Sequence, residues 1–238
     1  MERLSAGAVK LGLSLNSRQL EQFHIYYQEL LDWNKKINLT AITDYEEVQI
    51  KHFLDSLTVI LAWQQIKKTD FNLIDVGTGA GIPGLPLKIL FPDIKLVLLD
   101  SIAKKATFLH HLKQKLRLDD VEIVVGRAEE IAHETQYRER FDIILSRAVA
   151  PLSTLVELTL PFCAVGGSFI AQKKGAIDPE LSSAARAINT LGGNLREVKR
   201  VDLEEFADER WLVAIDKVSP TPPQYPRHPG IPAKRPIG

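Results

Sequence analysis

Residues 73–84, with the sequence LIDVGTGAGIPG, constrain the fold of this chain more than any other stretch. An apolar run from Leu73 to Val76 predicts a buried strand with Asp75 near its end. Glycines follow at positions 77, 79, 81 and 84, where the backbone can turn sharply because no Cβ obstructs it. Pro83 has the φ angle of a first helical turn. The stretch therefore predicts a strand, a glycine-rich loop and a helix start, where free backbone N–H groups bind nucleotide-like ligands.

The glycine pattern leaves the ligand open. Gly79, Gly81 and Gly84 fit G-x-G-x-x-G, and Asp100 lies close to the distance at which a dinucleotide fold places its ribose-binding acid, so the pattern permits NAD. It equally permits S-adenosylmethionine, whose class I fold uses a glycine-rich first loop and an acid after the second strand. A tight turn that binds nothing is the third interpretation, but four glycines in eight residues exceed what a plain turn requires.

The composition indicates a globular, cytoplasmic protein. At 238 residues and 45% hydrophobic content, the chain can bury a substantial core. It has no run near the roughly 18 apolar residues of a membrane span, and residues 1–10 lack the apolar core of a signal peptide. The single Cys163 excludes an intramolecular disulfide. Thirty basic and thirty acidic residues cancel, so the overall charge gives no sign of a strongly basic nucleic-acid binder.

The apolar periodicity predicts a doubly wound α/β sheet. Helical spacing from Ser17 to Trp33, and again after an Asp44–Glu47 capping box, predicts helices before the first strand. Strands and helices then alternate, and the last two strands, with no helix between them, should pair antiparallel. The expected strands are 73–76, 95–100, 121–125, 141–146, 168–172, 195–201 and 211–218, and the expected helices between them are 103–116, 129–138, 152–162 and 179–191. Seven strands with a closing hairpin are the inventory of the class I methyltransferase fold, whereas a dinucleotide domain would more often end in a sixth parallel strand.

The chain divides into three segments by composition and periodicity. They are an N-terminal helical extension at 1–68, an S-adenosylmethionine-binding domain at 69–218 and a basic tail at 219–238. The tail has seven prolines and no apolar period, so it is expected to be extended and without a helix. It carries Arg227, Lys234 and Arg235 without an acid, which favours contact with a polyanion such as RNA. Residues 104–117 are also basic, either as a solvated helix face or as a surface facing RNA.

Residues just beyond the carboxyl ends of the strands are candidate site residues, because ligands of doubly wound sheets bind there. An adenosine joined to a sulfonium needs an acid for the ribose, an apolar slot for adenine and polar partners for the purine edge. We expect Asp100 to bind the ribose, Ile82 and Ile102 to flank the adenine, and Ala128 and Glu129 to meet the purine edge. The other cofactor candidates are Gly77, Gly79, Gly81 and Ser101. The alternatives are that Asp100 caps a helix and that Glu129 is only a favourable first-turn acid.

The segment after the fourth strand narrows the reaction. It reads SRAVAP at 146–151 and lacks the NPPY or DPPY sequence common in enzymes that methylate exocyclic amines. Cys163 lies in PFCAVGG and is expected to be a small buried residue, not the nucleophile of carbon methylation. A guanine N7 carries an in-plane lone pair, so alignment with the methyl group suffices without a general base. Arg147 is the predicted catalytic residue, beside the methionine end of the cofactor or the incoming guanine, with a structural salt bridge as its alternative.

Other polar residues have weaker functional signals. His52 and Asp55 share a helix face, close enough for a hydrogen bond, either as a structural pair or as part of a surface that seats substrate. Arg127, Lys173 and Lys174 are candidates for phosphate contacts, and simple solvation is the alternative. We expect no metal site and no membrane contact, and slightly favour a monomer.

Taken together, several segments resemble the glucose-inhibited division protein B family, also called ribosomal RNA small subunit methyltransferase G. They are WNKKINLT at 33, KHFLDS at 51, DVGTGAGIPG at 75, LLDS at 98, RAEE at 127, SRA at 146 and YPRHPGIPAKRP at 225. The resemblance spans nearly the whole chain. The combination is highly specific, although the glycine loop alone is not.

The resemblance implies transfer of a methyl group from S-adenosylmethionine to N7 of guanine 527 in the 530 loop of 16S ribosomal RNA, free or within the small ribosomal subunit. Carried over residue by residue, it implies cofactor positions at Gly77, Ile82, Asp100 to Ile102, Ala128, Glu129 and Arg147. Ile82 stands where some members have Phe or Leu, so the apolar character is retained. An NAD-dependent small-molecule dehydrogenase and a non-catalytic ribosome assembly factor are the competing functions, and the intact cofactor loop argues against the second.

Overall fold

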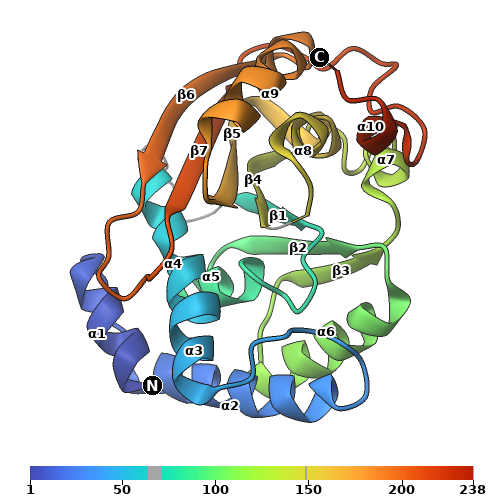
Figure 1. Ribbon diagram of the computed structural model, residues 1–238. Helices are drawn as coiled ribbons and strands as arrows, with labels where there is room; N and C mark the ends of the chain where they lie inside the picture. Colours follow the sequence, from blue (N-terminus) through green and yellow to red (C-terminus); the bar gives the residue numbers. More distant parts are fainter. Residues whose placement is uncertain (64–70, 148, 238) are drawn as a thin grey trace.

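A seven-stranded sheet is the central element of the computed structural model, which describes residues 1–63, 71–147 and 149–237 (Figure 1). The strands are β1 (Asn72–Val76), β2 (Lys95–Asp100), β3 (Val121–Val125), β4 (Phe141–Arg147), β5 (Cys163–Lys174), β6 (Gly193–Arg200) and β7 (Arg210–Lys217). Their order is β3-β2-β1-β4-β5-β7-β6. The first five strands run parallel, and β7 runs antiparallel between β5 and β6. This order confirms the predicted doubly wound fold with a terminal antiparallel hairpin.

Helices connect the strands and precede the sheet. They are α1 (Glu2–Lys10), α2 (Ser17–Asn34), α3 (Tyr45–Val48), η1 (Gln49–Leu54), α4 (Asp55–Leu57), η2 (Thr58–Ala62), α5 (Gly84–Leu90), α6 (Ala103–Leu116), α7 (Ala128–Ile131), α8 (Leu152–Thr159), η3 (Leu160–Phe162), α9 (Asp178–Thr190) and α10 (Ile231–Lys234). The segments from α3 to η2 follow one another without a break and include a π-helical turn at η1. The sequence did not predict α1, whose nine residues bury only Leu4, Gly7 and Ala8.

Side chains cap the two N-terminal helical stretches as their sequences predict. Asn16 accepts a hydrogen bond from the backbone of Gln19, whose side chain accepts one in return from the backbone of Asn16, which makes a complete capping box at α2. Asp44 accepts from the backbone N–H groups of Glu46 and Glu47 at α3. The predicted box there is incomplete, because the Glu47 carboxylate pairs with Lys51 at 2.6 Å instead.

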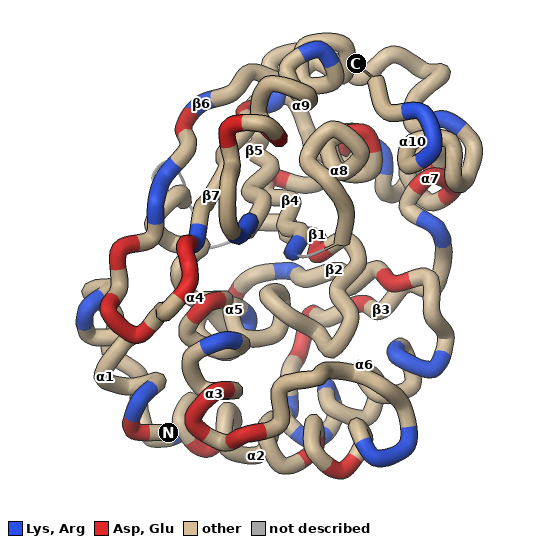
Figure 2. Tube along the Cα trace, viewed as in Figure 1, with Lys and Arg blue, Asp and Glu red and all other residues tan. Residues whose placement is uncertain are grey.

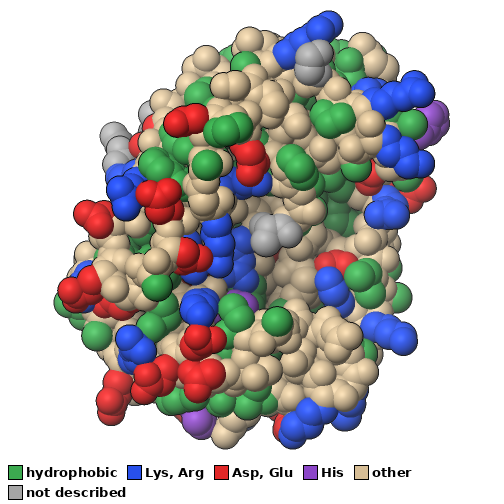
Figure 3. All heavy atoms as spheres, in the orientation of Figure 1, with side chains coloured by type: hydrophobic (Ala, Val, Ile, Leu, Met, Phe, Trp, Pro, Cys, Tyr) green, Lys and Arg blue, Asp and Glu red, His purple; other side chains and the backbone are tan. Residues whose placement is uncertain are grey.

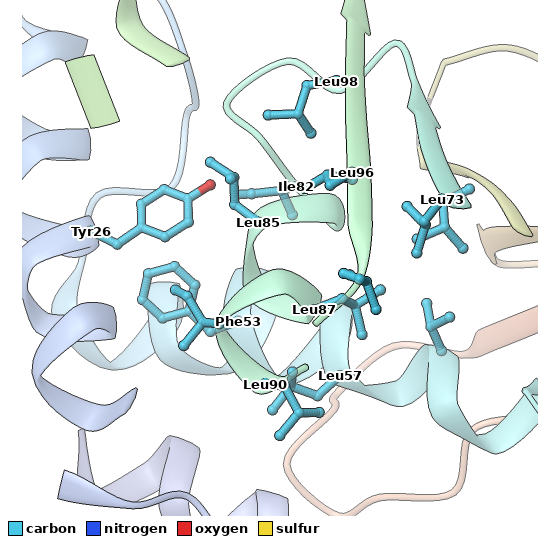
Figure 4. Packing of buried hydrophobic residues seen from close by; sticks show 14 of the residues in the cluster. Tyr26, Phe53, Leu57, Leu73, Ile82, Leu85, Leu87, Leu90, Leu96 and Leu98 are labelled. Carbon is cyan, nitrogen blue, oxygen red and sulfur yellow. The ribbon is translucent and has the colours of Figure 1, made fainter. Parts of the chain in front are cut away.

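The N-terminal helices and the sheet share one hydrophobic core. Phe23, Tyr26 and Phe53 are fully buried, in the same cluster as Leu85 of α5 and Leu98 of β2. Figure 4 shows the Tyr26 and Phe53 rings against the side chains of α5. The opposite face of the sheet is covered by α7, α8 and α9 and has a separate core. The expected boundary at residue 68 lies outside the described residues.

One predicted helix is wrong in length. The helix expected at 129–138 ends at Ile131, and a series of turns follows. The hydroxyl of Tyr137 donates to Glu122 at 2.6 Å, and the guanidinium of Arg138 donates to the carbonyl oxygen of Tyr225 at 2.9 Å. These distant contacts require side-chain positions that a continued helix would not provide, so tertiary contacts override the helical pattern.

The prediction of an extended, helix-free tail is also wrong, because residues 219–237 pack along α7 and α8 and contain α10 (Figure 1). Besides Tyr225, Arg138 donates hydrogen bonds to two further tail acceptors, the carbonyl oxygens of Thr221 and Pro222, at 3.1 and 3.2 Å. His133 lies 2.8 Å from the carbonyl oxygen of Pro226. Donors on the folded domain thus satisfy backbone carbonyls of the tail.

Candidate active site

Asp75 organises the glycine-rich loop at the end of β1. Its carboxylate is fully buried, and its Oδ2 accepts hydrogen bonds from Thr78 Oγ1 at 2.7 Å and from the backbone N–H of Gly84 at 2.9 Å. Burial raises the pKa of Asp75 to about 6. Its Oδ1 has no hydrogen-bond partner among the described residues. The acid therefore ties both ends of the loop together and keeps one oxygen free.

Two loop glycines are required by their surroundings. Gly77 has φ +73°, and a Cβ there would lie 2.6 Å from Val149 Cγ2. Gly81 has φ +89°, and a Cβ there would lie 2.5 Å from Leu85 Cδ1. Any other residue at these positions would be strained both by its backbone conformation and by contact with the next layer.

Asp100 connects the ends of β1 and β2. Its Oδ2 accepts from the backbone N–H of Gly79, and its Oδ1 accepts from that of Ile102, both at 2.9 Å. Lys105 Nζ lies 3.6 Å from the same carboxylate. The expected alternative, in which Asp100 caps a helix, is not what the structure has, because the cap of α6 is Ile102 and no side-chain cap bond forms. The carboxylate instead holds the glycine loop against the second strand end.

A cavity of about 350 Å³ lies over these strand ends. Its lining includes seven predicted site residues, Gly77, Gly79, Ile82, Asp100, Ser101, Ile102 and Arg147, together with Leu39, Thr40, His52, Thr78, Ala80, Lys105 and Val149. The cavity thus combines exposed backbone, an acid and an apolar wall. Figure 3 shows a hollow in this face of the molecule with Lys and Arg side chains along it. Gly81, Ala128 and Glu129 are not among the lining residues.

Glu129 is held by the tail. Its side chain is buried, and its Oε1 accepts a hydrogen bond from the backbone N–H of Gly230 at 3.0 Å. The sequence could not reveal this contact, because the two residues are 101 positions apart. The structure therefore shows a partner for Glu129 within the protein, and its contact with a purine edge stays a prediction.

Arg147 lies at the centre of the site and is bound from the N-terminal helices. Its Nη1 donates to Asp55 Oδ2 at 2.8 Å and to the carbonyl oxygen of Lys51 at 3.0 Å. Asp55, 3% exposed, also pairs through Oδ1 with Arg210 at 2.8 Å. Gln172 Nε2 donates to the backbone carbonyl of Asp55 at 2.6 Å. One buried carboxylate thus positions two guanidinium groups. The expected hydrogen bond between His52 and Asp55 does not form, because Asp55 pairs with the arginines, and Arg147 Nη2 lies 3.4 Å from His52 Nδ1.

His52 is neutral in this setting. Thr40 Oγ1 lies 2.7 Å from its Nε2, and the carbonyl oxygen of Lys51 lies 3.2 Å from its Nδ1. Thr40 Oγ1 already accepts from Ile42, so its proton can donate to Nε2, which leaves Nδ1–H to donate to Lys51. Burial, together with the nearby charge of Arg147, lowers the pKa of His52 to about 3. The sequence signals for these contacts are the WNKKINLT and KHFLDS segments, which did not reveal that Thr40 and Asp55 would reach the cavity and Arg147.

Some of the predicted phosphate-contacting residues form ion pairs within the protein, and others form none with a described residue. Lys173 pairs with Glu180 at 2.7 Å, and Arg227 makes a two-point contact with the fully buried Glu157 at 2.9 and 2.6 Å. Lys174 lies 3.4 Å from Asp208. By contrast, Arg127, Lys234 and Arg235 are exposed and form no ion pair with a described residue. The expectation that no acid balances the tail is therefore wrong for Arg227.

Cys163 is fully buried at the start of β5, as expected for a small apolar residue. Burial raises the pKa of its thiol to about 12, so it does not supply a thiolate. Among the described residues there is no cluster of three His, Cys, Asp or Glu side chains that could hold a metal ion. In the same part of the chain, no helix is long and apolar enough to cross a membrane.

The sheet order and the glycine loop at the β1–β4 switch point define the class I methyltransferase fold. Solved structures of similar architecture include a putative class I S-adenosylmethionine-dependent methyltransferase from Listeria monocytogenes, with TM-score 0.58 and 11% identity over 83% of this chain and 69% of that one. Another is the precorrin-6y C5,15-methyltransferase of Geobacter metallireducens, with TM-score 0.52 and 13% identity over 76% and 91% of the two chains.

Comparison of sequences identifies the family within this class. The family model described as rRNA small subunit methyltransferase G matches residues 19–208. Proteins named ribosomal RNA small subunit methyltransferase G are 54% identical in Dehalococcoides mccartyi strain CBDB1 and 49% identical in Roseiflexus castenholzii, each over the full length of both chains. The chain belongs to the rRNA small subunit methyltransferase G (GidB) family, which confirms the resemblance.

The residues of the cavity fit S-adenosylmethionine, the cofactor of this class. The cavity offers the backbone of the glycine loop, the carboxylate of Asp100 and the apolar side chains of Ile82 and Ile102. Ile102 is 47% exposed and lines the cavity, so its side chain is available to contact a flat ring. The donor and acceptor set agrees with a charged, ribose-containing ligand better than with an apolar one.

Proposed function

We propose that this protein transfers a methyl group from S-adenosylmethionine to N7 of a guanine in the 530 loop of 16S ribosomal RNA. The observation that carries the proposal is the cavity over the ends of β1, β2 and β4, lined by Gly77, Asp100 and Arg147, in a chain of this family. S-adenosylmethionine, when bound, supplies an electrophilic methyl group. The target would be guanine 527, the position implied by the family resemblance.

The surroundings of Arg147 support a reaction without a general base. His52 has a strongly lowered pKa, and both its ring nitrogens have partners in the protein. Asp55 is fully engaged by Arg147 and Arg210. The lowered pKa makes His52 a poor proton acceptor, and a guanine N7 requires no proton to be removed because it attacks through a lone pair. We assign to Arg147 the positioning of the cofactor's methionine end or of the guanine, and to Asp100 the binding of the ribose.

The N-terminal helices form part of this proposed site. We assign to residues 1–68 the wall opposite the sheet, because Leu39, Thr40 and His52 line the cavity. We assign the Gly81 backbone to the cofactor from the glycine pattern, and the Ala128–Glu129 segment from its place after β3 and from the family resemblance. In the structure, Glu129 Oε1 accepts from the backbone N–H of Gly230.

Incubation of the protein with labelled S-adenosylmethionine and small-subunit RNA lacking the modification tests the proposal. We expect one N7-methylguanine per RNA molecule, located by nuclease mapping and mass spectrometry, and inhibition by S-adenosylhomocysteine. Parallel calorimetric titrations with NAD should detect no binding. Absence of N7-methylguanine with naked RNA, partly assembled particles and complete subunits would overturn the substrate assignment, and NAD binding without S-adenosylhomocysteine binding would favour a dehydrogenase.

A further inference from the structure

The charges around the cavity are distributed unevenly, although the chain as a whole has 30 basic and 30 acidic residues. On one side of the molecule, lysines are neutralised by partners: Lys51 by Glu47 at 2.6 Å, and Lys10, at the end of α1, by Glu205 at 2.6 Å. Figure 2 shows acidic residues gathered on α3 and on the loop between β6 and β7 on that side. A polyanion approaching there would meet carboxylates and cations that are already paired.

The other side carries cations without partners. They lie on the α2–α3 loop, the start of α6, the residue before α7 and the end of the tail, which Figure 2 shows along one margin of the molecule. We call this set the basic stripe: Lys36, Lys104, Arg127, Lys234 and Arg235. Each is exposed, and no described residue forms an ion pair or side-chain hydrogen bond with it. Lys36 lies 5.5 Å from the centre of the Trp33 ring, and Glu130 is an exposed acid beside Arg127.

A groove joins the basic stripe to the cofactor cavity. It has a volume of about 260 Å³ and is lined by Lys36, Ile37, Asn38, Ile102, Lys104 and Lys105, with no carboxylate. Ile102 and Lys105 line the cavity as well, so the two depressions adjoin. Lys36 lies on the α2–α3 loop, within the WNKK segment, and Lys104 lies on α6. The fold brings these two lysines together in the groove beside the cavity.

We propose that the basic stripe binds the phosphate backbone of the acceptor RNA, and that the groove of Lys36 and Lys104 holds phosphates next to the nucleotide that enters the cavity. The inference rests on the proposed function for the identity of the RNA, but not for the position of the surface. Phosphates are contacted by flexible exposed cations, and an unpaired lysine binds them without first breaking an ion pair. The neutralised side then excludes the backbone by its carboxylates, so the RNA reaches the cavity from one direction.

Two variants with the same net charge test this surface. The first combines Lys36→Ala, Lys104→Ala and Arg127→Ala. The second combines Lys35→Ala, Lys115→Ala and Arg140→Ala, which removes three positive charges from the residue before Lys36, from the far end of α6 and from the residue before β4, at the amino end of that strand. Lys35 pairs with Asp32 and Lys115 lies 3.4 Å from Glu29, so these lysines are already neutralised.

The affinity for small-subunit RNA is measured between about 50 and 200 mM salt, and the slope of log K against log [salt] is compared. We expect the slope of the first variant to fall by about 2, since each lost contact with a single-stranded phosphate removes about 0.7. The slope of the second variant should equal that of the wild type. The affinity for S-adenosylhomocysteine and the unfolding midpoint should be unchanged in both.

Equal slopes for the two variants, or a wild-type slope in the first, would overturn the assignment of the stripe. This outcome differs from failure of the proposed function. If the wild-type protein binds RNA with the expected stripe dependence but forms no N7-methylguanine, the surface assignment holds and the reaction assignment fails. If it methylates RNA with equal slopes in both variants, the reaction holds and the stripe fails.

Discussion

At the scale of single residues, the site depends on how buried charges are paired. Arg147 is 92 positions from Asp55 in the sequence, yet Asp55 is its ion-pair partner and links it to Arg210. Removing one member of a buried pair leaves an uncompensated charge, which commonly costs about 3–5 kcal/mol. The orientation of Arg147 toward the cavity is therefore a property of the N-terminal helices as much as of β4.

Asp55→Asn should weaken methyl transfer, because it removes the ion-pair partner of Arg147. Loss of the carboxylate charge releases Arg147, so we expect methyl transfer to fall by at least about tenfold, equivalent to 1.4 kcal/mol in the barrier. The matched control is Asp208→Asn, which removes an exposed partner of Arg210 and should retain activity. The two variants and the wild type are compared by their single-turnover rates at saturating cofactor and by their unfolding midpoints. Full activity of Asp55→Asn would contradict a positioning role.

His52 should give the protein a specific pH dependence of stability. Its pKa is about 3 when folded and about 6.5 when unfolded, so below pH 6.5 the unfolded chain binds a proton that the folded chain does not. Stability is then lost as the pH falls, by about 2 kcal/mol between pH 6.5 and 5. Asp75, with its pKa raised to about 6, contributes in the opposite direction over this range, so in urea denaturation at pH 7.5 and 5 the contribution of His52 is the difference between variants; the exposed-site control His24→Gln should follow the wild type. The loss should be smaller in His52→Gln, and an identical loss there would contradict the assignment.

At the scale of elements, the tail is a structural strap on α7 and α8. Arg227 neutralises Glu157, which is fully buried, and Gly230 bonds Glu129 at the start of α7. The tail thus reaches the segment that follows the third parallel strand, whose end faces the cofactor side of the sheet. Its basic residues differ in role: Arg227 belongs to the fold, while Lys234 and Arg235 are free at the surface.

Arg227→Ala should destabilise the protein by about 3–5 kcal/mol, because Glu157 would be left buried without its partner. Arg235→Ala, in the same tail, should change stability by less than about 0.5 kcal/mol since its side chain has no described partner. Adding Glu157→Gln to Arg227→Ala should recover part of the loss. Equilibrium unfolding in urea measures all three, and equal stability of the two single variants would contradict the role of the pair.

At the scale of the whole molecule, the N-terminal helices and the sheet should unfold together. Phe23, Tyr26 and Phe53 lie in the same buried cluster as residues of β1, β2 and α5, and the rings of Phe23 and Phe53 are 5.0 Å apart. A shared core couples the two parts, because neither can separate without exposing apolar surface of the other. This coupling explains how residues such as Asp55 can position a side chain at the end of β4.

Phe53→Ala should therefore cost about 3–5 kcal/mol and shift one cooperative transition for the entire chain. Fluorescence of the tryptophans and amide exchange in β1 should report the same change, whereas Val9→Ala, which alters a side chain that is 66% exposed, should have little effect. Two separate transitions, with β1 protected after the N-terminal helices have unfolded, would contradict the shared core.

The sequence predicted correctly those features that depend on residues close together in the chain. The strand, glycine loop and helix start at 73–84 follow from local sterics and apolar periodicity, and so does the alternation that predicts seven strands. Asp100, Ile82 and Arg147 could be placed at the site because strand ends meet at one edge of a sheet. The capping roles of Asn16 and Asp44 were also predictable, since each contact spans three residues or fewer.

The sequence by itself therefore determined the fold class and half of the cavity lining, because backbone conformation and side-chain alternation are local properties, and its motifs indicated the family. Only the tertiary structure decided which charges are free. Arg227 is used by Glu157, Glu129 by Gly230, and Arg147 by Asp55, through contacts that span 70 to 101 positions. Composition counts every charge alike, whereas the packing of distant elements pairs some and leaves others exposed. That difference separates the arginine that holds the tail in place from the cations that we assign to RNA.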